Sequence, residues 1–127
     1  MNFIGLIAAA TAFLSIWLGH VAVRKIEFIS PTIWIPSLIF IILGIVCEWL
    51  SLRASNLQFA TIFGILSITL LFDAFEFIRQ QRRVRKGHAP ANSKNSRHAA
   101  ILAELNSHAT TLDLLKREPI GQRVTDH

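Results

Sequence analysis

Ionisable side chains stand at the ends of long apolar runs, where they could pair with each other or move ions across a membrane. Arg24 and Lys25 follow the first run, and Asp73 and Glu76 lie near the end of the third. Charged groups inside a membrane are costly unless they are paired or line a functional path. The sequence therefore predicts that Arg24 or Lys25 neutralises Asp73 or Glu76. An ion relay is the alternative, although the centres of the runs carry no charge.

His20 is the residue within these runs that could ligate a cofactor metal, because imidazole binds haem iron and the metal of chlorophyll-type pigments. Haem with two axial His ligands needs a second His, and no other lies within an apolar run. A homodimer or another subunit would have to supply it. We expect a packing role for His20, with lipid, haem or pigment binding as the alternative. No cofactor is predicted, although bound lipid is expected.

The sequence shows no arrangement of residues typical of catalysis. It contains no nucleophile beside a general base, no glycine-rich phosphate loop and no cluster of metal ligands. Cys47 is the only cysteine, so it can form neither an intramolecular disulfide nor a multi-cysteine metal site. Because catalytic sites need several convergent polar groups, we predict that the protein is not an enzyme.

Three apolar stretches are long enough to cross a bilayer, whose core of about 30 Å needs roughly 20 residues of helix. They are residues 3–23, 32–52 and 57–77. Charged residues make up 17% of the chain, whereas a soluble domain carries about 25%. We predict an all-α membrane protein, with a three-helix transmembrane module at residues 1–86 and a tail at residues 87–127.

The distribution of basic residues predicts the orientation of the helices. Residues 1–78 carry three basic and four acidic side chains, whereas residues 79–127 carry ten and four. Because cytoplasmic loops are enriched in Lys and Arg, the N-terminus should lie outside and the basic tail in the cytoplasm. Five residues are expected to contact anionic lipid headgroups: Arg79, Arg82, Arg83, Arg85 and Lys86.

Small residues recur at alternating spacings of three and four along the spans, and such residues let membrane helices approach closely. They favour packing of the three helices against each other. The long series in the first span could instead dock on another protein. The predicted packing residues are Gly5, Ala8, Ala12, Ser15, Gly19, Ala22, Gly44 and Gly64.

The tail contains a second helical pattern. Residues 96–117 are predicted to form an amphipathic helix that ends before Glu118-Pro119. Because short helices are marginal alone in water, its apolar stripe needs the headgroup layer or a partner. The predicted contacts are Ile101, Leu105, Leu112 and Leu115. Nucleic acid is not an expected partner, since aromatic residues for base stacking are missing after Phe77.

Two stretches resemble a family of small bacterial integral membrane proteins of unknown function. One is Gly19-His20 followed by residues 24–28 (RKIEF), and the other is Glu76 followed by residues 83–92 (RVRKGHAPAN). The resemblance covers residues 1–92, and residues 93–127 look like an addition. It departs from the family at Val21, where Pro is frequent, and at His88-Ala89, where aromatic residues occur. The resemblance implies the bacterial cytoplasmic membrane and attaches no activity.

These observations predict a non-catalytic accessory subunit of a larger bacterial membrane complex. The first span would pack into the complex, the basic region would set the depth at the cytoplasmic leaflet, and helix 96–117 would clamp a neighbouring subunit. A small homo-oligomeric transporter or channel using Glu48, Asp73 and Glu76 is one alternative. A lipid-, haem- or pigment-binding module using His20 is the other.

Overall fold

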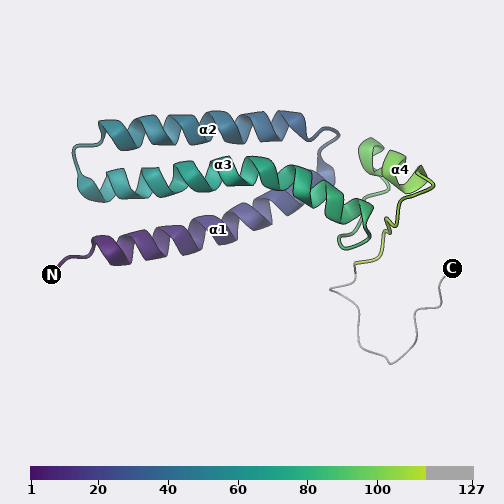
Figure 1. The fold of residues 1–127 in the computed structure, drawn as a ribbon, viewed down its shortest axis with the longest axis horizontal. Coiled ribbons are helices and arrows are strands. Elements are labelled where there is room, and N and C mark those ends of the chain that lie inside the picture. Colours follow the sequence, from purple (N-terminus) through teal and green to yellow (C-terminus); the bar gives the residue numbers. More distant parts are fainter. Residues whose placement is uncertain (114–127) are drawn as a thin grey trace, which may run out of the picture.

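This computed structural model describes residues 1–113, which contain four helices joined by connecting segments (Figure 1). α1 spans Ile4–Ile29, α2 spans Trp34–Arg53, α3 spans Leu57–Arg85 and α4 spans Ser96–Ala103. The described residues form no strand. α1, α2 and α3 are each long and apolar enough to cross a membrane, which confirms the three predicted helices and suggests a membrane protein.

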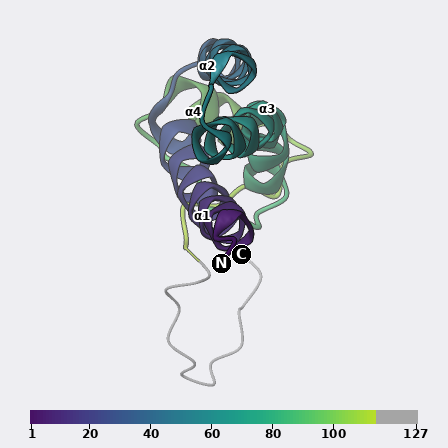
Figure 2. The ribbon, with the colours of Figure 1, turned by 90° about the vertical axis from the view of Figure 1, so that its left-hand side faces the viewer.

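α3 lies between α1 and α2 and packs against both (Figures 1 and 2). α1 and α3 run in the same direction, and α2 returns in the opposite one. Serine hydroxyls on α2 join it to α3 through backbone carbonyls. Ser37 Oγ donates to the carbonyl of Ala74, and Ser51 Oγ donates to that of Ala60 at 2.8 Å. Such interhelical hydrogen bonds hold helices together where water is absent.

Glycines set the spacing between α2 and α3. Gly44 is buried, and a Cβ built on it would lie 2.9 Å from Leu71 Cγ and 3.2 Å from the backbone oxygen of Ser67. A Cβ on Gly64 would lie 3.2 Å from Ser51 Oγ. The two helices can therefore approach closely because these positions carry no side chain.

α3 covers the C-terminal half of α1 and leaves its N-terminal half open. Its buried residues are Gly19, Val23 and Glu27, all toward its C-terminal end. At the other end, a Cβ built on Gly5 meets nothing within 4 Å. The other predicted packing residues of this helix are half-buried: Ala8, Ala12, Ser15 and Ala22. α3 therefore covers the small-residue series of α1 only in part.

α1 continues beyond the predicted end of its span. The basic residues after Val23 end the apolar run, but they do not break the helix, which reaches Ile29. Ser30 then turns to extended backbone, with ψ 129°. A residue before proline is pushed out of the helical region, and Pro31 accounts for the end of α1.

α3 ends in a glycine motif. The His88 N–H donates to the carbonyl of Arg83 at 2.8 Å, and the Gly87 N–H donates to that of Val84 at 3.0 Å. This pair of bonds is the Schellman motif, which satisfies the last carbonyls of a helix. Gly87 has φ +78°, which favours glycine. The chain then turns into residues 88–113, which we call the cap.

The predicted helix over residues 96–117 is wrong from residue 104 to residue 113, and residues 114–117 lie outside the described part of the chain. Glu104 is extended, with ψ 132°, and the following residues run back beside the end of α3. The His108 N–H donates to the carbonyl of Arg85 at 2.9 Å, and the Ala91 N–H donates to that of Thr110 at 2.8 Å. These bonds give the backbone an alternative to the helix, in a stretch rich in Ser, Asn and Thr, which favour turns.

The apolar stripe predicted for the tail is correspondingly broken. Ile101 is buried within the chain, whereas Leu105 and Leu112 are exposed. Leu115 lies outside the described residues. Val84, Ala89 and Ala91 form the small apolar core of the cap, with Leu102 packed against them. The exposed side of the cap is therefore not the continuous apolar face that the sequence predicts.

Gly44→Ala should destabilise the bundle, because the new methyl group would crowd Leu71 and the backbone of Ser67. We expect its free energy of unfolding to fall by about 1–3 kcal/mol relative to Gly5→Ala. Gly5→Ala is the matched control, since the same substitution there meets open space. Unfolding in mixed micelles with increasing SDS measures both, and equal stabilities would contradict the packing role of Gly44.

Candidate functional site

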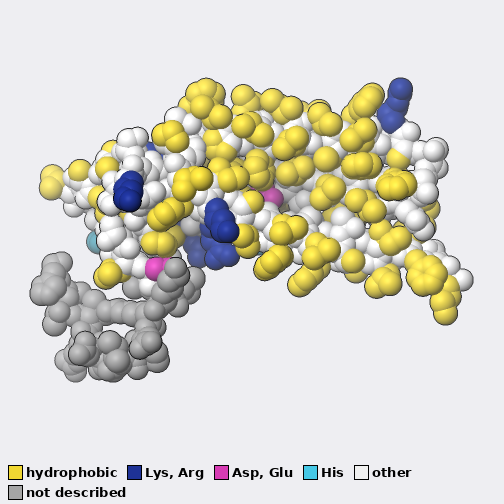
Figure 3. All heavy atoms as spheres, turned by 180° about the vertical axis from the view of Figure 1, so that it is seen from behind, with side chains coloured by type: hydrophobic (Ala, Val, Ile, Leu, Met, Phe, Trp, Pro, Cys, Tyr) yellow, Lys and Arg dark blue, Asp and Glu magenta, His cyan; other side chains and the backbone are white. Residues whose placement is uncertain are grey.

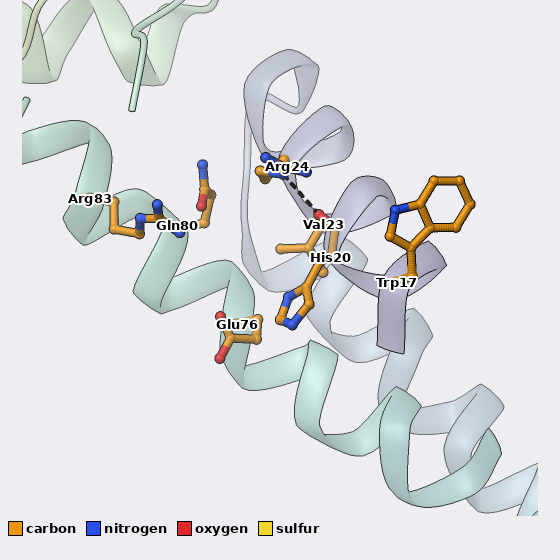
Figure 4. A pocket seen from close by; sticks show the side chains of 7 residues that line it. All are labelled: Trp17, His20, Val23, Arg24, Glu76, Gln80 and Arg83. Carbon is orange, nitrogen blue, oxygen red and sulfur yellow. Dashed lines mark hydrogen bonds between the residues drawn. The ribbon is translucent and has the colours of Figure 1, made fainter. Parts of the chain in front are cut away.

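A cleft of about 370 Å³ opens between α1 and α3, toward the end of the bundle that carries the cap. Small-molecule sites commonly enclose about 300–1,000 Å³, so the cleft can hold part of a small ligand. Side chains from both helices line it at helical spacing: Trp17, His20, Val23 and Arg24 from α1, and Glu76, Gln80 and Arg83 from α3 (Figure 4).

The arginines of the cleft are not neutralised by carboxylates of the described residues. Arg24 Nε donates to the backbone carbonyl of His20 at 3.4 Å, and Arg83 forms no ion pair within residues 1–113. Glu76 accepts from Arg79 on its own helix at 2.8 Å. The cleft therefore holds two guanidinium groups. The charge of its one carboxylate, Glu76, is offset by Arg79, which does not line the cleft.

The ion pair predicted between α1 and α3 is not formed within the described residues. Glu76 pairs with Arg79, which lies one turn further along α3. Arg24 and Lys25 are both exposed and take no carboxylate partner in this part of the chain. A pair three positions apart on one helix forms locally, so Glu76 does not need a partner from α1.

Asp73 instead fills the space that Gly19 leaves open. Asp73 is 7% exposed, and a Cβ built on Gly19 would overlap its carboxylate. Close approach of α1 to α3 at this level therefore depends on glycine. His20 follows directly and lines the cleft. Among residues 1–113, no group of three or more His, Cys, Asp or Glu side chains could hold a metal ion.

A buried carboxylate holds the cap against the end of α1. Glu27 is 1% exposed, and its Oε1 accepts from Arg97 Nη1 at 2.8 Å and from His98 Nε2 at 2.9 Å. Arg97 also donates to Gln81 Oε1 at 2.8 Å. We call Glu27, Gln81, Arg97 and His98 the Glu27 cluster. It joins α1, α3 and α4 through one oxygen atom and one guanidinium group.

Hydrogen bonds define which nitrogen of His98 carries the proton. The backbone N–H of Asn92 donates to Nδ1 at 2.9 Å, so Nδ1 is unprotonated. Nε2 therefore carries the proton and donates it to Glu27. Both ring nitrogens are occupied and the ring is fully buried. His98 therefore links the cap to the end of α1 through hydrogen bonds on both ring nitrogens.

The cap also satisfies carbonyls at the end of α1, where a helix has no internal donors. The carbonyl of Phe28 accepts from the side-chain amides of Asn92 and Asn95, each at 3.1 Å. Asn95 donates as well to the carbonyl of Ser30 at 2.8 Å. Its Oδ1 accepts from the Arg97 N–H at 3.0 Å and caps α4. Asn95 thus joins the ends of two helices.

The sequence contained only weak signals of the Glu27 cluster. Asn95-Ser96 before a helical pattern is a helix-start signal, and Glu27 is the only acidic residue between the first two spans. Neither signal identifies the pairing, because Glu27 and Arg97 are separated by 70 positions. The family-like stretches that contain Phe28 and Asn92 do meet here.

The five residues predicted to contact lipid headgroups all lie on the surface at the cap end of α3: Arg79, Arg82, Arg83, Arg85 and Lys86. Arg85 pairs with Glu104 at 3.1 Å. Figure 3 shows hydrophobic side chains over the bundle and Lys and Arg side chains gathered beside it, toward the cap. This arrangement is compatible with the headgroup contacts, which stay a prediction.

The fold and site define a class of protein: a bundle of three helices of membrane-spanning length, closed at one end by a polar cap. A family model described as a domain of unknown function, DUF4491, matches residues 2–95, and the chain belongs to this family. The match confirms the resemblance to a family of unknown function. Neither curated proteins nor solved structures gave a match.

The matched range divides the Glu27 cluster. It includes Glu27 and Gln81, together with the two asparagines that bind the end of α1, but it ends before Arg97 and His98. The two side chains that bind the buried carboxylate therefore come from the part of the chain that follows the family match.

Glu27→Ala should release the cap, because it leaves Arg97 buried without its counter-charge. Breaking a buried ion pair by removing one partner typically costs about 3–5 kcal/mol. We expect amide hydrogen exchange of residues 92–103 to accelerate strongly, with the bundle helices far less affected.

Glu104→Ala is the matched control, since it removes an exposed carboxylate of the cap that also pairs with an arginine, Arg85 at the end of α3. Exposed pairs contribute only about 0–1 kcal/mol, so exchange should change little. Equal exchange in the two variants would show that the Glu27 cluster does not hold the cap.

Proposed function

We propose that this chain is a non-catalytic accessory subunit of a larger bacterial membrane complex and that the open half of α1 joins it to the complex. The observation that carries the proposal is the open space at Gly5, where an added Cβ meets nothing within 4 Å. α1 has no buried residue before Gly19. Because small residues let helices approach closely, this half suits a helix of a partner subunit.

The proposed location is the bacterial cytoplasmic membrane, with the N-terminus outside and the cap in the cytoplasm. The exposed basic residues at the cap end of α3 support this orientation, because cytoplasmic segments are enriched in Lys and Arg. Arg53 is the basic residue of the described part at the opposite end of the bundle. Anionic lipids would then contact the basic surface beside the cap.

We propose for the cap a different role from the clamp predicted for the tail. Ile101 is buried in this chain and is not free to bind a neighbour. The Glu27 cluster instead ties the end of α1 to α3 and α4. In the proposed complex, it would hold the covered half of α1 in place while the open half contacts the partner.

The transporter alternative gains less support. Glu48 lies on α2 toward the α2–α3 connection, whereas Asp73 and Glu76 lie in the half of α3 nearer the cap (Figure 1). The three carboxylates are thus spread over different depths, and Asp73 is buried against Gly19. A shared pore would have to be built by several copies of the chain.

Gly5→Leu should weaken assembly with the partner while leaving this chain folded, because the new side chain meets open space in the monomer but blocks close helix approach. Native mass spectrometry of the tagged protein, expressed from its own locus and extracted in mild detergent, would measure this. We expect the unmodified chain to copurify stoichiometrically with larger subunits and the variant to lose most of them.

Ala10→Leu is the matched control, because Ala10 is exposed on the same helix and lies away from the small-residue series. It should retain the larger subunits. A ring of identical chains without larger subunits would overturn the accessory role and favour the pore. If both variants retained the larger subunits equally, the open half of α1 would not be the docking face.

A further inference from the structure

We propose that the cleft between α1 and α3 binds one anionic phospholipid, with Arg24 and Arg83 holding the headgroup phosphate and Trp17 beside its acyl chains. The two arginines come from different helices and line one cleft (Figure 4). A guanidinium group matches the planar arrangement of two phosphate oxygens and keeps its charge at all physiological pH values. The site does not depend on whether the chain has protein partners.

Both cleft arginines lack a carboxylate partner among the described residues, unlike three other arginines at this end of the molecule. Arg79, Arg85 and Arg97 are each paired with a carboxylate. Arg24 and Arg83 have no such partner within residues 1–113. A phosphate entering the cleft would therefore gain two cationic contacts without breaking an existing ion pair.

The lining carries a net positive charge. Arg24 and Arg83 contribute +2 and Glu76 contributes −1, which leaves a formal charge of +1 from the Arg and Glu side chains of the lining. Arg79 further offsets the Glu76 charge from outside the cleft, at 2.8 Å. A headgroup with a net negative charge therefore fits the cleft better than a zwitterionic one, whose ammonium group would face two guanidinium groups.

The order of residues along the cleft matches the order of groups in a phospholipid. Moving along α1, the lining changes from Trp17 to His20 to Arg24, and along α3 it changes from Glu76 to Gln80 to Arg83. Tryptophan prefers the boundary between acyl chains and headgroups. Phe13 and Leu14, one turn before Trp17, are 71% and 52% exposed. They supply the apolar surface that acyl chains require and that a free phosphate ion would not use.

Native mass spectrometry of the full chain, released from nanodiscs of mixed phosphatidylglycerol and phosphatidylcholine, tests the proposal. The unmodified chain should retain one phosphatidylglycerol. The double variant Arg24→Gln with Arg83→Gln should retain it about thirtyfold less, in keeping with two lost cationic contacts near the membrane surface. Lys25→Gln with Arg82→Gln is the matched control, because it removes the same charge from exposed neighbours that do not line the cleft.

We expect the control to change retention less than about twofold, since it leaves both cleft arginines in place. Equal loss in the two double variants would overturn the site and assign the lipid to the general basic surface. Equal retention of the two lipids by the unmodified chain would overturn the preference for an anionic headgroup. Displacement of the lipid by millimolar inorganic phosphate would overturn the lipid as the occupant.

A second measurement leaves the cleft arginines intact. In a chain with Trp34→Phe and Trp49→Phe, Trp17 is the only remaining tryptophan. Its fluorescence should be quenched more by phosphatidylglycerol with brominated acyl chains than by the matching phosphatidylcholine, at equal mole fraction. Equal quenching by the two lipids would contradict a bound anionic lipid beside Trp17, even if the arginine variants failed to fold.

Discussion

A carboxylate buried at the end of a long helix constrains everything around it. Glu27 is almost completely removed from solvent, and an unpaired charge in such a place would cost several kcal/mol. Arg97 neutralises this charge and His98 donates a hydrogen bond to it, but both residues follow α3 in the chain. The chain must therefore turn back at Gly87 and bring α4 against the end of α1, which makes the cap an integral part of the bundle.

Different interactions hold the three long helices together. Between helices of membrane-spanning length, hydrophobic burial would supply little drive in lipid, so close packing and hydrogen bonds to the backbone carry the arrangement. Gly44 lets α2 approach α3, and Gly19 makes room for Asp73 on the other side. α3 is central because it meets both neighbours. The described contacts leave α1 covered near the cap and open near Gly5.

This division gives the two ends of α1 different properties. Near the cap, the helix is fixed by the Glu27 cluster and bears Arg24 at a charged cleft. At the other end, it presents small and apolar residues without a covering helix. The end of α1 near the cap is held beside the basic surface, and its other end is open within the apolar part. This arrangement suits a subunit that is anchored at one membrane surface and packs laterally. The two proposals for this chain rest on these separate regions.

The sequence by itself determined the three long helices, because about 20 consecutive apolar residues satisfy a local requirement of the bilayer. The end of α3 is likewise set by a local feature, the glycine at position 87. Only the tertiary structure decided the partner of Glu27, because Arg97 lies 70 positions further along the chain. It also ended α4 at Ala103, since hydrogen bonds from the following described residues to the end of α3 compete with helical ones. The periodicity of apolar residues describes one segment alone. The partner of a buried charge and the end of a helix in the cap depend on which other segments the fold brings beside them.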